Sequence, residues 1–274
     1  RIDLFLSNMQ GRNFLFRNRG PGDDGRWRFE ERAAEAGVTR PEEGFPTWFW
    51  DYNNDGWLDL FVSGYSATRL GGGLVARDQA IEYWNLPREA ERLWLYENDG
   101  DGTFTDVTAA RNLDTVVYSM GANFGDLDND GWLDFYLGSG EPDFQAIVPN
   151  RMFRNDRGKR FQDVTTAGGF GNLQKGHGVA FGDLDHDGDQ DVYTVMGGVH
   201  ESDTYHNLLF RNPGNDNAWI TLDLVGADNA RDAVGARIQV DLETAAGERR
   251  TVHAHVNNGG SFGSSPFRQT LGLG

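Results

Sequence analysis

The sequence predicts an all-β protein built from β-propeller blades, and three observations carry this prediction. An Asp-rich segment occurs three times in register, an apolar strand follows each occurrence, and an aromatic strand ending in Asn comes later in each repeat. Four short strands in each unit of roughly 40–75 residues are typical of a propeller blade. Paired helices would instead show a period of about 3.6 residues, whereas these segments alternate or run apolar.

Each repeat has the same predicted order: strand, Asp loop, strand, strand, strand. The strand after the loop is expected at Leu58–Val62, Leu133–Leu137 and Asp191–Met196. The strand that ends in Asn is expected at Leu93–Asn98, Arg151–Asn155 and Asn207–Asn212. A further strand ending in Asp-Val-Thr is expected at Phe104–Thr108 and Phe161–Thr165.

The first blade is predicted to begin midway, without an Asp loop of its own. Ile2–Leu6 matches the strand after a loop, and Asp3 is in register with the last Asp of each loop. Phe14–Asn18 and Trp27–Glu31 match the next two strands. About three and a half blades are therefore present, while a closed propeller needs at least about four. We expect a sequence cut on its N-terminal side with more blades upstream, or else an open arc closed by a partner chain.

Two segments depart from the repeat. Residues 66–91 form an insertion, in which Gly71–Gly73 is expected to be a flexible break and Asp78–Trp84 and Arg88–Leu93 short helical turns. Such a surface insertion can carry function but is more often an excursion of the chain.

After Asn212 the repeat stops, so residues 1–212 are predicted to be blades and residues 213–274 a small β module. Its strands are expected at Trp219–Val225, Ala236–Leu242 and Arg249–Val256, with a loop at Gly259–Ser265.

The amino-acid composition limits which classes of partner and which kinds of site are expected. Acidic residues outnumber basic ones 42 to 25, and a formal charge of -17 disfavours binding to nucleic acid or anionic lipid. The chain has no cysteine, which excludes disulfides, thiolate zinc sites and a cysteine nucleophile. No apolar run approaches the roughly 20 residues of a membrane helix, and the chain opens on a strand rather than a signal peptide. A signal could have been removed or not included.

The Asp loops have the chemistry of calcium sites. Calcium takes roughly six to eight oxygen ligands in irregular geometry. Carboxylates or amides at loop positions one, three, five and nine can surround it, with a backbone carbonyl from position seven and a Gly at position six for the sharp turn. The predicted ligands of the first loop are Asp51, Asn53, Asp55, the Trp57 carbonyl and Asp59. Those of the second are Asp126, Asp128, Asp130, the Trp132 carbonyl and Asp134. Those of the third are Asp183, Asp185, Asp187, the Asp189 carbonyl and Asp191.

Calcium is favoured over the alternative ions. Magnesium demands near-octahedral geometry, and zinc prefers His and Cys, which do not occupy the ligand positions. The alternative is that the loops are ion-free turns that cap hairpins. Three loops in register favour about three bound calcium ions, each stiffening a blade edge. Affinities of the kind found in extracellular modules imply a calcium-rich compartment.

Other patterns are weaker. His253 and His255 share a strand face, either as a two-ligand pair or as part of a solvated surface. His177 and His186 flank the third loop without matching its ligand positions, and His200, Glu201, Asp203 and His206 could gather at a propeller face. The 8 Trp and 18 Phe are expected to pack mainly between blades, although aromatic platforms can also bind sugars.

Several motifs resemble a known family. Phe124-Gly125-Asp126, Phe181-Gly182-Asp183, the Asp loops and the Phe-x-Asp-Val-Thr strands resemble FG-GAP/VCBS repeats of integrin-α-type propellers. The first loop departs, with Trp50 in place of the Gly, so its preceding strand is expected to sit differently.

The tail resembles an ASPIC/UnbV domain. The similarity rests on Ala218–Leu222, Asn229–Arg237, Gly259–Phe262 and Leu271–Gly274. The combination is similar to the cartilage acidic protein family and its bacterial relatives, which continue past this point, so truncation is expected at this end too.

The resemblance implies a seven-bladed propeller in an exported, cell-surface or periplasmic protein. Its implied role is calcium-stabilised binding, adhesion or surface assembly, with a protein or glycan ligand and possible self-assembly. It implies no single catalytic activity, because propellers host many functions. Two alternatives stay open: a polysaccharide or sugar lyase or dehydratase on the same scaffold, and a subunit of an extracellular filament.

Overall fold

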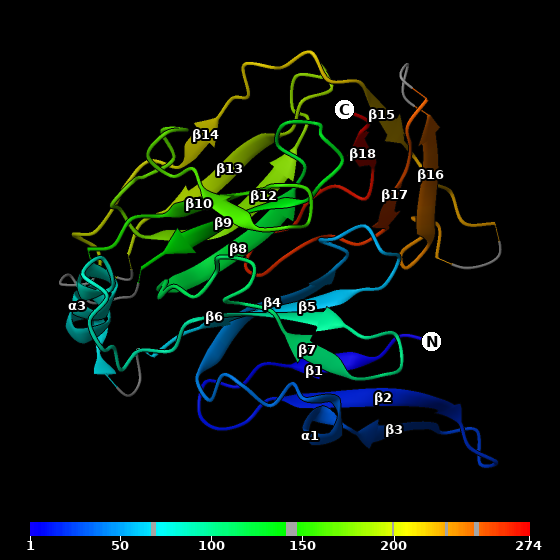
Figure 1. Cartoon of the computed structure of the whole chain (residues 1–274), viewed down its shortest axis with the longest axis horizontal. Coiled ribbons are helices and arrows are strands. Elements are labelled where there is room, and N and C mark those ends of the chain that lie inside the picture. Colours follow the sequence, from blue (N-terminus) through cyan, green and yellow to red (C-terminus); the bar gives the residue numbers. More distant parts are fainter. Residues whose placement is uncertain (67–69, 141–146, 199, 228–229, 244–246) are drawn as a thin grey trace.

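The computed structural model describes residues 1–66, 70–140, 147–198, 200–227, 230–243 and 247–274. Small antiparallel sheets follow one another along the chain and fan out side by side (Figure 1). In Figure 1 the first sheet is dark blue, the second runs from lighter blue to teal, the third is green and the fourth runs from yellow-green to yellow, and the orange and red C-terminal strands lie to one side. The predicted all-β, propeller-like fold is confirmed.

The blades contain three, four, four and three strands, as predicted. The first is β1 (Leu4–Leu6), β2 (Phe14–Pro21) and β3 (Trp27–Glu31), followed by the short helix α1 (Ala33–Ala36). The second is β4 (Gly44–Trp50), β5 (Asp59–Gly64), β6 (Leu93–Asn98) and β7 (Phe104–Asp106). The third is β8 (Ser119–Gly125), β9 (Asp134–Ser139), β10 (Arg151–Asn155) and β11 (Phe161–Asp163). The fourth is β12 (Gly176–Gly182), β13 (Asp191–Met196) and β14 (Leu208–Phe210).

Neighbouring blades meet along their first strands. β4 contacts β8, and β8 contacts β12, so these strands line the inner side of the arc. Aromatic residues fill the space between the second and third blades, as predicted. Trp50 stacks on Phe161 with ring centroids 5.7 Å apart, and it meets Phe135 edge to face at 5.7 Å.

The register assigned to Asp3 is confirmed. The Asn18 amide donates to Asp3 Oδ1 over 2.7 Å. The Asn98 amide makes the equivalent bond to Asp59 Oδ1 at 2.9 Å. The strands β1, β2 and β3 of the first blade therefore correspond to the second, third and fourth strands of a complete blade.

The expectation that Trp50 displaces its strand is wrong. Trp50 pairs with Asp59 just as Gly125 pairs with Asp134. A Cβ at Gly125 would overlap Gln190 and the ring of Phe181. Trp50 instead lies fully buried among the rings of the next blade. A large residue is accepted at this position because the neighbouring blade leaves room for it, so the strand keeps its place.

The insertion agrees with its prediction only in part. The expected helical turn at Asp78–Trp84 lies largely within helix α3 (Gly72–Glu82), but α3 begins within the expected glycine break, and Arg88–Leu93 is not helical. The fully buried Asp78 carboxylate holds the insertion together, since it accepts the amides of Glu89 (2.6 Å) and Ala90 (2.8 Å). Residues 67–69 of the predicted insertion lie outside the described residues.

The segment from residue 213 to 274, called the C-terminal module below, forms two small sheets. β15 (Trp219–Leu222) pairs with β18 (Gln269–Gly272), and β16 (Arg237–Glu243) pairs with β17 (Arg249–His255). Three of these strands were predicted, and β18 was not. Asn229, part of the predicted tail motif, lies outside the described residues. In Figure 1 the module and α3 occupy opposite sides of the molecule.

Candidate metal centres

The three Asp loops have one backbone design. They are loop 1 (Asp51–Asp59), loop 2 (Asp126–Asp134) and loop 3 (Asp183–Asp191). The fourth residue of each lies in the left-handed region, with φ of 54° at Asn54, 54° at Asn129 and 62° at His186. The Gly at position six also has positive φ. These two positions let the chain turn back within the loop, and Asn and Gly adopt such angles at the least cost.

The carboxylate at position one ties each loop to itself. Asp126 Oδ1 accepts the Asp130 amide at 3.1 Å, and Asp126 Oδ2 accepts the Gly131 amide at 2.9 Å. Asp51 and Asp183 make the same pairs of bonds to their own loops. Because these bonds set the curvature of the loop, the position-one side chain is both a predicted ligand and the organiser of the turn.

The Asp at position nine joins the loop to the blade. Asp134 Oδ2 accepts the Leu127 amide at 2.8 Å, and its Oδ1 accepts the Asn155 amide at 2.7 Å. Asp59 and Asp191 repeat this arrangement. Each carboxylate oxygen retains a further lone pair, so these bonds are compatible with the predicted ligand role.

The carboxylates of loop 2 are close enough to share a cation. Asp126, Asp128 and Asp130 each offer an oxygen within 4.8 Å of the other two, and Asp183, Asp185 and Asp187 do the same in loop 3. Asp128 Oδ1 is buried and has no hydrogen-bond partner. A buried oxygen without a partner is costly unless something satisfies it. The donor set therefore fits a hard divalent cation.

Burial opposes ionisation of these groups when no cation is present. Burial, with the neighbouring Asp130, raises the pKa of Asp126 to about 8. Burial and then Asp128 raise the pKa of Asp130 to about 6. In loop 1, burial raises the pKa of Asp51 to about 6 and that of Asp59 to about 8. A bound dication would remove this penalty by pairing with the charged forms.

A charged residue that was not among the predicted site residues lies beside position three of each loop. Arg154 Nε donates to Asp128 Oδ2 at 2.5 Å, and Arg211 Nε donates to Asp185 Oδ2 at 2.7 Å. In loop 1 position three is Asn53, and Glu97 takes the place of the Arg, paired with Arg111 at 2.8 Å. The signal was present in the sequence, because each of these residues comes just before the Asn that ends its strand.

A family profile described as an FG-GAP-like repeat matches residues 1–62, 75–137 and 138–194. The chain belongs to the FG-GAP-like repeat family. The matched segments include all three loops and most of the blade strands. The end of β5 and the last part of the fourth blade lie outside them.

Curated relatives of this FG-GAP-like repeat chain include cartilage acidic protein 1. The human protein is 27% identical over 238 residues, which is 72% of this chain and 33% of that protein. The Mus musculus protein gives the same identity over 72% of this chain and 34% of its own length. The Xenopus tropicalis protein is 28% identical over 124 residues, 44% of this chain and 16% of its own length. The chain thus spans about a third of the first two relatives.

Loop position seven supports a repeat-structural role for its Trp. The Trp57 ring lies over Gly100, and the Trp132 ring lies over Gly158, each in the hairpin that follows in an adjoining part of the repeat array. The side chains therefore pack against turns of the same blade, while their carbonyls remain predicted ligands. In loop 3 of this FG-GAP-like array the same position is Asp189, whose buried side chain accepts Asn129 Nδ2 at 2.9 Å.

The structure also places the residues that were predicted as possible histidine clusters. Asp203 pairs with Lys175 at 2.6 Å, and both side chains are almost fully buried, so this carboxylate is engaged in an ion pair. His177 Nε2 lies 2.5 Å from the Gly197 carbonyl. His253 and His255 are half-buried against the blades rather than on a solvated face.

Among the described ranges, no helix is long and apolar enough to span a membrane.

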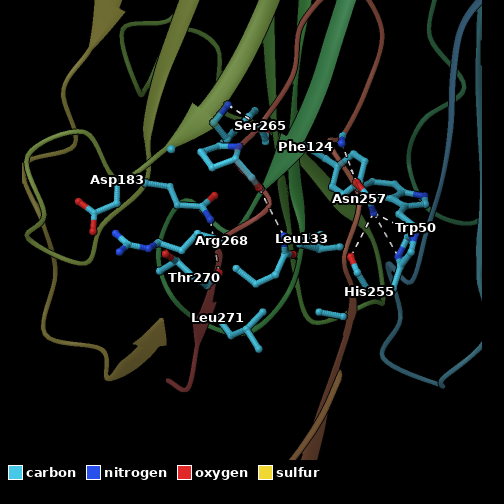
Figure 2. A pocket seen from close by; sticks show the side chains of 18 of the residues that line it. Trp50, Phe124, Leu133, Asp183, His255, Asn257, Ser265, Arg268, Thr270 and Leu271 are labelled. Atoms are coloured by element: carbon cyan, nitrogen blue, oxygen red, sulfur yellow. Dashed lines mark hydrogen bonds between the residues drawn. The ribbon is translucent and has the colours of Figure 1, made fainter. Parts of the chain in front are cut away.

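A cavity of about 290 Å³ lies between the loops and the C-terminal module. Figure 2 shows Asp183, Arg268 and Thr270 on one side of it and Trp50, His255 and Asn257 on the other. Asn257 Nδ2 contacts the His255 ring nitrogens at 2.9 and 3.2 Å. Burial and then the charge of Arg237 lower the pKa of His255 to about 4. The module is therefore part of the surroundings of the loops.

Proposed function

We propose that this chain is the calcium-binding part of an exported β-propeller protein that acts as a binding or adhesion module. Loops 1, 2 and 3 each hold one calcium ion, which clamps the edge of a blade. The observation that carries the proposal is the acidic cluster of loop 2, where three carboxylate oxygens converge and Asp128 Oδ1 is buried without a partner.

The charge arrangement supports a dication in particular. Loops 2 and 3 each bring four Asp side chains at the predicted ligand positions. Arg154 and Arg250 beside loop 2, and Arg211 beside loop 3, offset only part of that charge. Carboxylates held a few Å apart in a partly buried site repel strongly. Oxygen-only donors in an irregular arrangement suit calcium better than magnesium or zinc.

Export and ligand binding are parts of the same proposal. Low-affinity calcium loops require a compartment in which calcium is abundant. The similarity to cartilage acidic protein 1, and the repeat family itself, support a propeller that presents a binding surface. We further propose that residues 213–274 are an ASPIC/UnbV-like module, and that the ligand is a protein or glycan at the cell surface.

Calcium binding is tested by titration calorimetry and by thermal unfolding with and without chelator. We expect about three ions per chain and a melting temperature that falls by at least several degrees when calcium is removed. Ligands that bind only the native state stabilise it by about 2.7 kcal/mol at a hundredfold excess over Kd. A melting temperature and near-UV spectrum that do not respond to chelator would contradict the calcium proposal.

The binding role is tested separately on the calcium-loaded chain. A glycan array distinguishes a glycan ligand from a protein ligand. Turnover of a polysaccharide with release of unsaturated products would contradict a purely binding role and favour the lyase alternative.

A further inference from the structure

The three Asp loops lie side by side and form a continuous surface. Asn54 Nδ2 of loop 1 donates to the Gly131 carbonyl of loop 2 at 2.7 Å. Asn129 Nδ2 of loop 2 donates to the Gly188 carbonyl of loop 3 at 3.1 Å. Position four of one loop therefore reaches position six of the next, so the shape of each loop depends on its neighbour.

The C-terminal module covers this surface at every loop. At loop 1, the His253 amide donates to Asn54 Oδ1 at 2.9 Å, and Arg237 Nη1 donates to the Gly56 carbonyl at 3.2 Å. At loop 3, the Trp219 ring lies directly on Gly188, and Gln190 Nε2 donates to the Thr270 carbonyl at 3.3 Å.

The contacts at loop 2 include a predicted metal ligand. The Gly272 amide of β18 donates to Asp126 Oδ2 at 3.0 Å. Asn217 Nδ2 donates to the Asp128 carbonyl at 2.8 Å, and Arg250 Nη1 donates to the Asp130 carbonyl at 2.7 Å. Gly272 must be a glycine because a Cβ there would overlap Asp126 and Asn129.

A second set of contacts is independent of the loops. Ser261 forms a two-way backbone bridge with Ala122 on β8, with N–O distances of 2.9 and 2.7 Å. Asn123 Nδ2 donates to Ser265 Oγ at 3.1 Å, and the rings of Phe45 and Phe262 lie 5.4 Å apart. The part of the segment between β17 and β18 around Ser261 therefore lies along the inner strands of the blades.

We propose that the cation-loaded loops are the docking surface for β15–β18, so that a divalent cation controls whether this part of the chain is held against the blades. The inference rests on the proposed calcium binding. Without a cation the clustered carboxylates repel one another. The loop carbonyls that accept hydrogen bonds from Asn217 and Arg250 then no longer hold their positions. With a cation, the loop backbone takes the shape that the module recognises.

Thermodynamic linkage makes the proposal reciprocal: if calcium favours docking, docking must strengthen calcium binding by the same factor. A substitution in the module that touches no predicted ligand should therefore weaken calcium binding.

Hydrogen exchange on the full chain tests the inference directly. We expect chelation with EDTA to speed exchange of the β18 amides by at least about tenfold. The peptide containing Ser261 should change much less, because its partner is β8, and it serves as an internal control. Calcium binding is measured in parallel by calorimetry. If calcium binds and β18 exchange does not respond, the docking inference is wrong and the calcium proposal stands. If no heat of binding appears, both fail.

Trp219→Ala tests the reciprocal effect. Its ring is neutral and packs on Gly188, so its removal loosens β15 and, through their pairing, β18. We expect calcium affinity to fall about fivefold or more, within the usual range of coupling between sites. Trp84→Ala is the matched control, since Trp84 is exposed on the insertion. Circular dichroism confirms that both variants fold. Equal affinities in Trp219→Ala and the unsubstituted chain would overturn the inference.

Discussion

Loop 2 and loop 3 have nearly the same sequence pattern but different surroundings. Asp126 is almost fully buried, and loop 2 receives hydrogen bonds from loop 1 and from β18. In loop 3, Asp185 and Asp187 are exposed, and His186 stands where loop 2 has the buried Asn129. The comparison shows that the repeated sequence sets the internal turn of a loop. The segments packed around the loop set how deeply its carboxylates are buried, and therefore how strongly those carboxylates affect stability.

The largest expected difference is at position one. We expect Asp126→Asn to lower stability in saturating calcium by about 3 kcal/mol, because one cation is lost and an amide group now faces the N–H donors of Gly131 and Gly272. Asp183→Asn should lose one cation as well but cost less, since no module amide donates to Asp183 among the hydrogen bonds described. Calorimetric unfolding and calcium stoichiometry measure both. Equal losses of stability would break the comparison.

The next effect concerns position four. Asn129 donates to the Gly188 carbonyl and to Asp189 from a fully buried position. Asn129→Ala should cost about 2 kcal/mol, because two buried acceptors lose their donor. His186→Asn should instead be neutral or stabilising by a few tenths of a kcal/mol, because Asn tolerates positive φ better than His. Chemical denaturation of the two variants decides whether the loops differ in this way.

A pH effect of intermediate size is expected at His255, beside the cavity between the loops and the module. Its pKa is lowered to about 4, chiefly by burial, whereas an unfolded His titrates near about 6.5. The contribution of the neutral ring is present above about pH 6.5 and is lost as pH falls toward 4, because the unfolded chain then binds the proton first. His255→Gln should reduce the loss of stability between pH 7 and pH 5 by up to about 2 kcal/mol. A variant with the same pH profile as the parent would rule this out.

The smallest effect is expected from Arg154 and Arg211, which pair with the Asp at position three of loops 2 and 3. Arg154 competes with a cation for Asp128, so Arg154→Gln should tighten calcium binding a few-fold and lower the melting temperature of the metal-free chain. Arg211→Gln should do less, since the Arg211 side chain is 71% exposed and its charge is better screened. Calorimetry at low and high salt separates the two, and tighter binding in neither variant would show that the Arg does not compete.

Local patterns allowed much of the fold to be predicted. β3, β6, β10 and β13 begin and end at the predicted residues, because each is bounded by turn residues and has a clear apolar or aromatic pattern. The Asp3 register followed from alignment alone. β18 was missed because Gln269–Gly272 is short and becomes a strand only by pairing with β15. The start of α3 was missed because Gly71–Gly73 favours a break, and the contacts of Asp78 were not visible in the sequence.

Some features of the predicted site depend on residues close in the sequence, and others depend on distant residues. The loop turns follow from the spacing of Asp, Asn and Gly, since the bonds of position one lie within nine residues. Arg154 and Gln190 act on loop 2 from elsewhere in the chain, and Gly272 reaches Asp126 across 146 residues. No pattern within the loop could have predicted these contacts.

The sequence by itself determined the repeat, the shape of each Asp loop and the oxygen donors within it, because these depend on interactions between residues close in the chain. Only the tertiary structure decided how deeply each loop is buried and which part of the chain covers the three Asp loops. Those properties depend on how separate blades and the C-terminal module pack, and packing joins residues whose separation in the chain carries no local signal.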